Sequence, residues 1–434
     1  MKKIITVIYT LSFVIGAVSA QSVYDGVKIA DKDLNGTARF VGMGGAMGAL
    51  GGDITTMGTN PAGIGIYRSN DVMTSFSYSA YGMESKYEGQ KSTIDKNRWS
   101  FDNIGVVFAT KIGNQTPLRY VNFGFNYKRS KSFYKNMSMS GMMGVVENPS
   151  NPGSPYYVSQ TNSMALQATD AERYVWDNSR QHLDFDNANR IFSDPDAGWL
   201  GALGYQGGLT ERDRIDNEPD LYVPFLPVEP SSVFNSREKG GIDQYDFNVS
   251  FNINDRVYLG LTIGAYDVDY DKYSGYDESY KRGEGYSLES YNNISGSGFD
   301  VKMGLILRPF EYSPFRIGFA VHTPTFYKLT YSTSAIVTND YRDAKTDELK
   351  RIIVDTYDYV GDMKRDYRLV TPWKYNVSLG YTVGTSLALG AEYEYEDYST
   401  MKFKYSSNDG GGDMEFENAE VKNCLKGEHT FRIG

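Results

Sequence analysis

The chain has 434 residues, of which 14% are aromatic and 45 are glycine, an excess that favours strands and turns over a helical bundle. Its formal net charge of -10 argues against a nucleic-acid partner, because such proteins need a cationic face. The single cysteine, Cys424, excludes a disulfide framework, and with three histidines in the chain a zinc site of the Cys/His kind is nearly excluded.

Residues 1–20 have the pattern of a secretory signal peptide. Lys2 and Lys3 supply the positive start, residues 4–14 the apolar run, and Val18-Ser19-Ala20 the small residues of a cleavage site. The apolar run is shorter than the ~20 residues that a spanning helix needs, so we predict export and cleavage after Ala20. After the signal, no run of about 18 apolar residues occurs in the chain. An exported chain of this kind is either a soluble β-protein or an outer-membrane β-barrel, because lipid tolerates only helices and closed barrels.

The next segment, residues 21–69, does not alternate and is rich in glycine instead. A dinucleotide-binding loop would need a third glycine at position 47, which is Met47, and no strand precedes it. The glycines therefore indicate a compact element whose backbone packs closely against a neighbour. If the strands that follow form a barrel, that neighbour is the barrel wall and the segment is a plug. The glycines of this cluster are Gly42, Gly44, Gly45, Gly48, Gly51 and Gly52.

From residue 70 onward, apolar residues recur at every second position, as in half-buried strands. Each apolar face covers roughly nine to eleven strand positions, the length that a tilted barrel strand needs to cross a membrane. Aromatic residues lie at the ends of these faces, and tight turns alternate with long links, which favours a barrel over a soluble sandwich. The predicted strands are 71–84, 100–111, 118–134, 241–254, 256–271, 295–309, 314–331, 366–383, 385–404 and an opening strand at 428–434.

The longest link, at about 146–238, is a candidate extracellular loop, and loops of this length are usually functional or disordered. Trp176, Trp199, Tyr222 and Phe225 are its candidate substrate-binding residues. The alternative is that these aromatic groups pack only a small core within the loop itself.

Two sets of acidic residues recur at every second position. Glu392, Glu394 and Glu396 have neighbours about 6.6–7 Å apart, a spacing compatible with glycoside hydrolysis. We expect instead that they pair inside the barrel with bases such as Lys302, Arg316 and Lys374, and we predict no catalytic residue. The second set, Asp267, Asp269 and Asp271, continues a lipid-facing register and predicts the point where a strand leaves hydrocarbon.

Thr37 to Ala46 and then Asn60-Pro61-Ala62-Gly63 resemble the N-terminal hatch of the FadL/TodX family of outer-membrane transporters for hydrophobic compounds. Gly318 to Thr325 and Trp373 to Tyr381 look like two barrel strands of that family, and the resemblance spans residues 37 to 434. The long loop matches nothing residue by residue, which leaves the ligand open.

This resemblance implies an all-β, antiparallel transmembrane barrel of fourteen strands, a hatch in its lumen and a large extracellular loop with a first, low-affinity ligand site. It also implies passive, ligand-triggered uptake, a rearrangement near the mature N-terminus and lateral exit through a gap in the wall. Asn60, Pro61, Ala62 and Gly63 would be the gating residues of the hatch. About nine to ten strands are visible, so we predict a C-terminally truncated chain.

We therefore predict a signal peptide at 1–20, a hatch at 21–69 and an incomplete barrel at 70–434, in a monomer of the bacterial outer membrane. The predicted function is passive uptake of long-chain fatty acids or aromatic hydrocarbons. The expected partners are hydrophobic small molecules and outer-membrane lipids, with no cofactor and no metal. A haem-uptake protein that uses His322, a secretion-associated structural barrel and a barrel enzyme (lipase or protease) are the alternatives.

Overall fold

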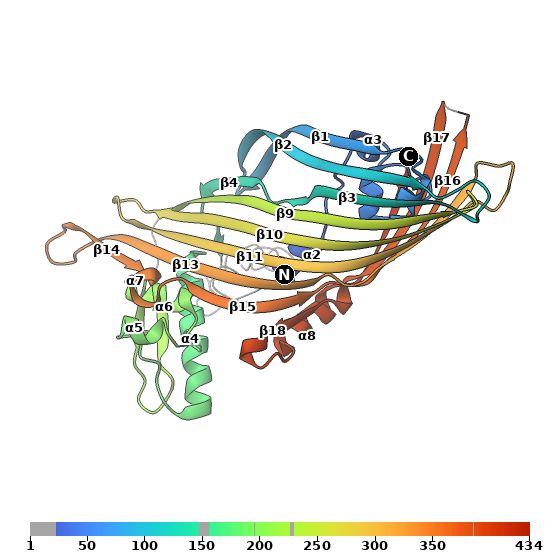
Figure 1. The fold of residues 1–434 in the computed structure, drawn as a ribbon. Coiled ribbons are helices and arrows are strands. Elements are labelled where there is room, and N and C mark those ends of the chain that lie inside the picture. The colour runs from blue at the N-terminus through green and yellow to red at the C-terminus, as the bar shows by residue number, and fades with distance from the viewer. Residues whose placement is uncertain (1–22, 147–155, 195, 226–229, 385) are drawn as a thin grey trace.

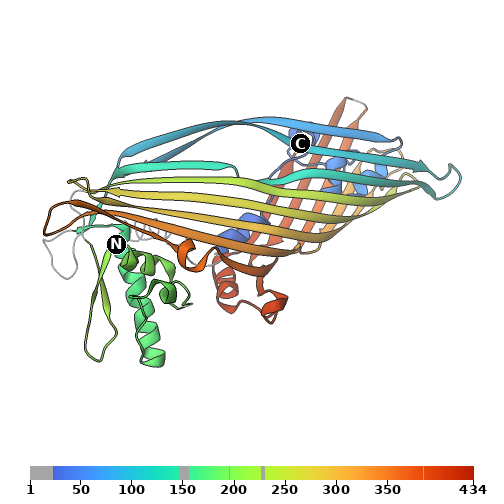
Figure 2. The ribbon, with the colours of Figure 1, turned by 60° about the vertical axis from the view of Figure 1, so that its left-hand side comes forward.

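The computed structural model describes residues 23–146, 156–194, 196–225, 230–384 and 386–434. The predicted signal peptide and its cleavage site lie outside these residues. One antiparallel sheet of fifteen strands dominates the described chain and curves around the N-terminal helices (Figures 1 and 2). None of the described helices is long and apolar enough to cross a membrane. The predicted all-β antiparallel fold is confirmed.

Ten strands form the main path of the sheet, and along this path each strand pairs with the next. In spatial order they are β1 (Asp71–Tyr87), β2 (Gln90–Lys111), β3 (Leu118–Ser132), β9 (Ser231–Ile253), β10 (Val257–Ser279), β11 (Gly285–Leu307), β12 (Arg316–His322), β16 (Lys374–Val383), β17 (Leu387–Asp397) and β19 (Gly427–Ile433). No pairing joins β1 to β19 within the described residues, so this sheet is open.

Five strands branch from the path: β4 pairs with β9, β13 pairs with β11, β14 and β15, and β15 pairs with β18. Their bounds are β4 (Lys135–Met142), β13 (Phe326–Arg342), β14 (Leu349–Asp355), β15 (Met363–Val370) and β18 (Lys402–Tyr405). Short helices follow β14, β17 and β18; they are α7 (Thr356–Val360), η3 (Tyr398–Thr400), η4 (Ser407–Asp409) and α8 (Glu415–Cys424).

Three strands predicted as continuous are broken: 314–331 into β12 and β13, 366–383 into β15 and β16, and 385–404 into β17 and β18. Pro324 and Pro372 lie at the first two breaks, where a residue without an N–H cannot continue the ladder. Threonine hydroxyls replace backbone acceptors there. Thr323 Oγ1 accepts from the Val301 N–H at 3.0 Å, and Thr371 Oγ1 accepts from the Thr325 N–H at 2.8 Å. Figure 1 shows β16 and β17 diverging from β13 and β15 beyond this line.

The sheet exposes apolar side chains on its convex face and buries polar side chains on its concave face, the opposite of the arrangement in a soluble protein. In β9, Phe247 is 55% exposed, whereas the neighbouring Asp246 and Asn248 on the concave face are buried. The same alternation runs through β10, where Leu261 and Ile263 face outward. We call the outward apolar surface the apolar belt. Its members include Val72, Phe76, Phe108, Phe123, Phe247, Leu261, Ile263, Phe299, Met303, Phe319, Val377, Leu379 and Leu389.

Strands β9, β10 and β11 are each 23 residues long, about 75 Å at the usual rise per residue. They extend well past the ends predicted from alternation, because cross-strand pairing continues where the outward residues become charged. Residues 272–293 lie between two predicted strands and were expected to form a long link. Most of them instead belong to a hairpin, in which β10 and β11 pair up to Ser279 and Gly285.

The predicted long loop contains a small folded unit, residues 160–224, which we call the loop subdomain. Its elements are α4 (Gln160–Ser179), α5 (Ala188–Ile191), α6 (Trp199–Gln206), β7 (Thr210–Asp213) and β8 (Leu221–Pro224), and the short pair β5 (Val145–Val146) and β6 (Tyr156–Tyr157) precedes it. Its apolar core is continuous with Leu288 of β11 and Val337 of β13. Figure 2 shows the helices of the subdomain at one end of the sheet.

A buried carboxylate attaches the loop subdomain to the sheet. Glu278, near the end of β10, accepts hydrogen bonds from the hydroxyl of Ser159, which caps the N-terminus of α4, and from the N–H of Gln160 at 3.0 Å. The positive end of the α4 dipole stabilises the same charge. Three tyrosine hydroxyls complete the shell of donors, those of Tyr276, Tyr280 and Tyr286.

We expect Glu278→Ala to release the loop subdomain without unfolding the sheet, because the buried donors lose their shared acceptor. The free energy that holds the subdomain in place should fall by about 2–3 kcal/mol. Limited proteolysis should then cut within 160–224 faster by roughly 30- to 150-fold. Glu289→Ala is the matched control, since Glu289 also accepts from two tyrosines but on the outer face. Equal cleavage rates in both variants would contradict the attachment.

Candidate functional site

The N-terminal segment, residues 23–69, lies on the concave face of the sheet (Figure 2). It contains α2 (Val23–Ala30), α3 (Ala38–Gly42), η1 (Ile54–Gly58) and η2 (Pro61–Ile66). Asp53 organises its centre: the carboxylate accepts from the Thr37 hydroxyl at 2.6 Å, the Arg39 guanidinium at 3.1 Å and the Thr55 N–H at 2.9 Å. One buried side chain therefore caps η1 and connects it to the start of α3.

Two pairs of glycines turn the chain sharply in this segment. Gly44 and Gly45 have φ of 59° and 80°, and Gly51 and Gly52 have φ of 60° and 67°, a region that favours glycine. A Cβ atom at Gly51 would lie 2.8 Å from the Cα of Gly63. The glycine cluster thus lets two turns of the segment come into backbone contact.

Asn60 and Pro61 join the segment to two strands of the wall. Asn60 is fully buried; its Nδ2 donates to Gly48 O at 2.8 Å and to Leu305 O of β11 at 3.4 Å, and its Oδ1 accepts from the Ala62 N–H at 3.2 Å. The Pro61 carbonyl accepts from the Ser250 hydroxyl of β9 at 2.8 Å. The structure therefore brings the predicted gating residues, Asn60 to Gly63, together in one buried turn against the sheet.

Glycines of the strands make room for this turn. A Cβ at Gly260 would lie 2.3 Å from the Pro61 carbonyl carbon, and one at Gly304 would lie 2.1 Å from Asn60 Oδ1. At Gly390, a Cβ would meet the Ala46 carbonyl oxygen at 2.0 Å. In the sequence these glycines stand at positions opposite the apolar face of their strands. Their interleaving with Leu259, Leu261 and other belt residues was the signal for a surface that another backbone approaches.

A lysine with no exposed surface neutralises two aspartates of the wall. Lys302 Nζ lies 2.9 Å from Asp246 Oδ1 and 2.8 Å from Asp300 Oδ1. The expectation that Lys302 and Arg316 pair with the glutamates of β17 is wrong. Arg316 instead donates to the Leu50 carbonyl at 2.5 Å, because the register of β12 faces it toward the N-terminal segment.

The three glutamates of β17 pair with two other bases. Lys374 lies 3.3 Å from Glu394 and 2.8 Å from Glu396, as expected for Lys374. Arg432 of β19 lies 3.0 Å from both Glu392 and Glu394. All three carboxylates are compensated, so their spacing serves ion pairing across β16, β17 and β19.

A polar cavity of about 320 Å³ separates part of the N-terminal segment from these charges; it is lined by Lys32, Lys128, His322 and Glu394 among others. Burial lowers the pKa of Lys32 to about 8, and the Asp300 carboxylate 4.0 Å away opposes this shift. His322 is itself buried, and its Nε2 makes a hydrogen bond with the Thr59 carbonyl at 2.7 Å.

An apolar cluster of buried tyrosines packs around α2. Val23, Ile29 and Ala30 of α2 pack into it, and Lys28 donates to the Tyr270 hydroxyl at 2.7 Å. Strands β10, β13 and β15 supply its tyrosines, which are Tyr266, Tyr270, Tyr327, Tyr331 and Tyr367. Among the described residues, the hydroxyls of Tyr327 and Tyr367 are buried without a hydrogen-bond partner. We call this cluster, together with the space that α2 fills, the tyrosine chamber. Its α2 lining could not be predicted, because it depends on where the curved sheet places a short helix.

The structure separates the four predicted substrate-binding residues. Trp199 and Tyr222 are buried in the core of the loop subdomain. Trp176 packs against His182 with ring centres 4.7 Å apart and the ring planes tilted by 39°, and Phe225 is exposed. Thr161, at the first turn of α4, donates to the Phe225 carbonyl, which places Phe225 roughly 22 Å along the helix from Trp176. Their binding of substrate stays a prediction.

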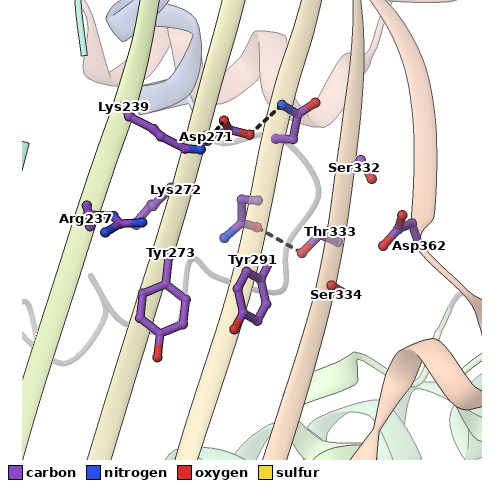
Figure 3. A pocket seen from close by; sticks show the side chains of 12 residues that line it. Arg237, Lys239, Asp271, Lys272, Tyr273, Tyr291, Ser332, Thr333, Ser334 and Asp362 are labelled. Carbon is purple, nitrogen blue, oxygen red and sulfur yellow. Dashed lines mark hydrogen bonds and ion pairs between the residues drawn. The ribbon is translucent and has the colours of Figure 1, made fainter. Parts of the chain in front are cut away.

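A second hollow, of about 600 Å³, opens on the sheet farther along the strands (Figure 3). Lys239, Asp271 and Tyr273 have the same outward register as Leu261, and Lys239 pairs with Asp271 at 3.4 Å. The outer face therefore changes from apolar to charged within one strand. This change marks one edge of the apolar belt.

No protein-family model matches the sequence, and no curated protein sequence matches it. Among solved structures, the fold is similar to that of the toluene transporter TbuX of Ralstonia pickettii, at 11% identity and a TM-score of 0.34 over 88% of this chain and 78% of that one. It is also similar to a FadL homologue of Pseudomonas aeruginosa, at 9% identity and a TM-score of 0.28 over 93% and 97%. FadL gives its name to the family that the hatch motif resembles. Because both TM-scores are below 0.5, we argue the function from the contacts of this chain alone.

We expect Asn60→Ala to loosen the N-terminal segment by about 1–3 kcal/mol, since the Gly48 and Leu305 carbonyls lose a donor and η2 loses its cap. Amide hydrogen exchange of residues 44–66 should accelerate by roughly tenfold or more, while exchange in β9 and β10 stays unchanged. Asn70→Ala is the matched control, because Asn70 makes its backbone hydrogen bond at an exposed position away from the segment. Unchanged exchange in the Asn60 variant would show that this side chain does not hold the segment.

Proposed function

We propose that this protein is an outer-membrane transporter that takes up hydrophobic molecules passively through a plugged β-sheet wall. The observation that supports this proposal best is the apolar belt. Each large apolar side chain left in water forgoes about 1.5–3 kcal/mol that burial would supply. A sheet that exposes Phe247, Ile263 and Leu379 while it buries Asp246 and Lys302 is suited to lipid on its outer face.

The tyrosine chamber supports hydrophobic ligands as the cargo. Its aromatic rings and the apolar side of α2 offer a surface for an alkyl chain or an aromatic ring, and the unpartnered Tyr327 and Tyr367 hydroxyls offer a polar end point. In this proposal the ligand replaces α2, an eight-residue helix held by Lys28 and its buried face. Long-chain fatty acids and aromatic hydrocarbons are the ligand classes.

The N-terminal segment acts as the hatch in this proposal. Its turn at Asn60 to Gly63 blocks the passage between the chamber and the far end of the wall, and movement of this turn opens it. The side exit is the line of breaks between β12 and β13 and between β15 and β16. Thr323 and Thr371 hydroxyls complete the ladder there, and Phe299 and Phe326 face the lipid side with ring centres 5.4 Å apart.

No observation as strong as the apolar belt supports the other functions considered from the sequence. The Nε2 atom of His322 is hydrogen-bonded to the Thr59 carbonyl of the hatch, so haem iron would have to displace the hatch to reach this nitrogen. The glutamates of β17 are ion-paired, which leaves no free acid and base pair for hydrolysis among them.

We expect Leu261→Arg to impair insertion into lipid, because Leu261 lies midway along the outward apolar face of β10 and a cation at such a depth costs about 2–4 kcal/mol. Urea titration of the protein refolded into phospholipid vesicles should show a lower free energy of unfolding by that amount. Asp277→Arg is the control, because Asp277 faces outward on the same strand beyond the belt. Equal stabilities of the two variants in vesicles would contradict a lipid-facing belt.

Vesicles that contain the protein should take up a fluorescent long-chain fatty acid faster than empty vesicles. The double variant Asn60→Ala/Pro61→Ala should change this rate, because both residues hold the hatch against β9 and β11. Replacement of residues 160–224 by a Gly-Ser linker should slow uptake most at low ligand concentration. Leakage of a small polar dye, measured in parallel, separates hatch opening from damage to the vesicle. Uptake no greater than in empty vesicles would refute the transport function.

A further inference from the structure

Three metal-ligating side chains converge in the loop subdomain, outside the hatch and the tyrosine chamber. Glu172 lies in the middle of α4, His182 follows its end, and Asp220 precedes β8. His182 Nδ1 is 2.5 Å from Glu172 Oε1 and 3.8 Å from Asp220 Oδ2, and one ligand atom of each residue lies within 4.8 Å of the others. No other group of His, Cys, Asp or Glu side chains converges in this way in the part of the chain that the structure describes.

The burial of Glu172 is the second observation that points to a cation. This carboxylate has no exposed surface, and its described partners are the His182 ring and the Leu183 N–H at 2.9 Å. Apart from the His182 ring, no basic side chain pairs with it among the described residues, and a buried carboxylate with so few partners is costly. A divalent cation between Glu172, His182 and Asp220 would compensate this charge.

The types of ligand atom at this site favour Zn²⁺ over Ca²⁺. One imidazole nitrogen and two carboxylate oxygens are ligands of Zn²⁺, whereas Ca²⁺ takes oxygen ligands alone. Zinc–ligand distances near 2.0 Å put the ligand atoms of a tetrahedral site roughly 3.3 Å apart, so zinc binding would lengthen the His182–Glu172 contact of 2.5 Å and shorten the His182–Asp220 distance of 3.8 Å. The His182 side chain is 43% exposed, so the fourth position is open to water.

Groups around the three ligands hold them in place. The Leu183 amide orients the second oxygen of Glu172, the guanidinium of Arg212 lies 3.8 Å from Asp220, and the tilted Trp176 ring packs against His182. Supporting contacts of this kind orient the ligands in protein metal sites.

We propose that Glu172, His182 and Asp220 form a zinc site that ties α4, the turn after it and the segment before β8 into one unit. The subdomain contains no cysteine, because the single cysteine of the chain is Cys424. A small unit of this size commonly needs a disulfide or a metal for stability. The zinc site supplies this link for the loop subdomain. This proposal departs from the sequence-based prediction of no metal, whose argument rested on the scarcity of cysteine and histidine and did not consider a site with two carboxylates.

The first test measures zinc binding to the full chain purified in detergent without a histidine tag and stripped with EDTA. We expect one zinc per chain by elemental analysis after dialysis, and at least tenfold weaker binding in His182→Ala and in Asp220→Asn. His429→Ala is the matched control, since His429 lies on β19 beside Tyr393, and it should bind as the wild type does. Absence of bound zinc, or equal zinc binding in the wild type, H182A and D220N, overturns the proposal.

The second test uses Trp176 as a local reporter, because its ring contacts His182. Titration with Co²⁺, which quenches nearby indole fluorescence, should reduce the emission of the wild type, and Zn²⁺ should restore it. The quenching should be lost in Trp176→Phe, while excess Ca²⁺ or Mg²⁺ should not compete. Proteolysis within 160–224 without metal checks that each variant is folded; if H182A is not, D220N decides the outcome. Quenching that persists in W176F, or reversal by Ca²⁺ at similar concentration, overturns the proposal.

Discussion

The polar lining of the concave face determines how the rest of the molecule is arranged. Side chains that turn away from the apolar belt must find hydrogen-bond partners, and the backbone of the N-terminal segment supplies many of them. Asn122 of β3 donates to the carbonyls of Ile64 and Tyr67 at 2.7 and 2.9 Å, and Ser250 of β9 donates to Pro61. The wall and the N-terminal segment, the proposed hatch, therefore satisfy each other's hydrogen-bonding groups.

This arrangement fits a hatch that is firmly held and still able to move. Each neutral hydrogen bond between hatch and wall contributes about 1 kcal/mol net, and water can take the place of either partner. The ion pairs of Lys302 and Lys374 lie within the wall itself, so hatch movement need not break them. In the proposed mechanism, the apolar contacts of α2 are exchanged for ligand, while the charged framework of the wall stays in place.

The far end of the strands has a different chemistry. There the outer face is charged, and Glu278 fixes α4 of the loop subdomain through its capping residue Ser159. The contact between Glu278 and the N-terminus of α4 attaches the loop subdomain, residues 160–224, to the sheet. The proposed zinc site would link the parts of the same subdomain to one another. The loop is therefore a structured unit with its own core, which Trp199 and Tyr222 help to fill.

The sequence by itself determined the strand class, the two faces and the tight turns, because these depend on residues close together in the chain. The period of two assigned Leu261 and Phe247 to one face, and Asn254 and Asp255, at the junction of the predicted strands 241–254 and 256–271, form a tight turn with φ of 52° and 55°. Pro324 and Pro372 indicate the strand breaks locally, because proline cannot donate a hydrogen bond to a neighbouring strand. The prediction of continuous strands relied on alternation alone and missed these breaks. Only the tertiary structure decided which charges meet. Register across strands gives Lys302 to Asp246 and Asp300, and folding of the loop brings Asp220 to Glu172 across 48 residues of chain. Such contacts depend on how strands and turns align in space, and no local pattern in one sequence specifies that alignment.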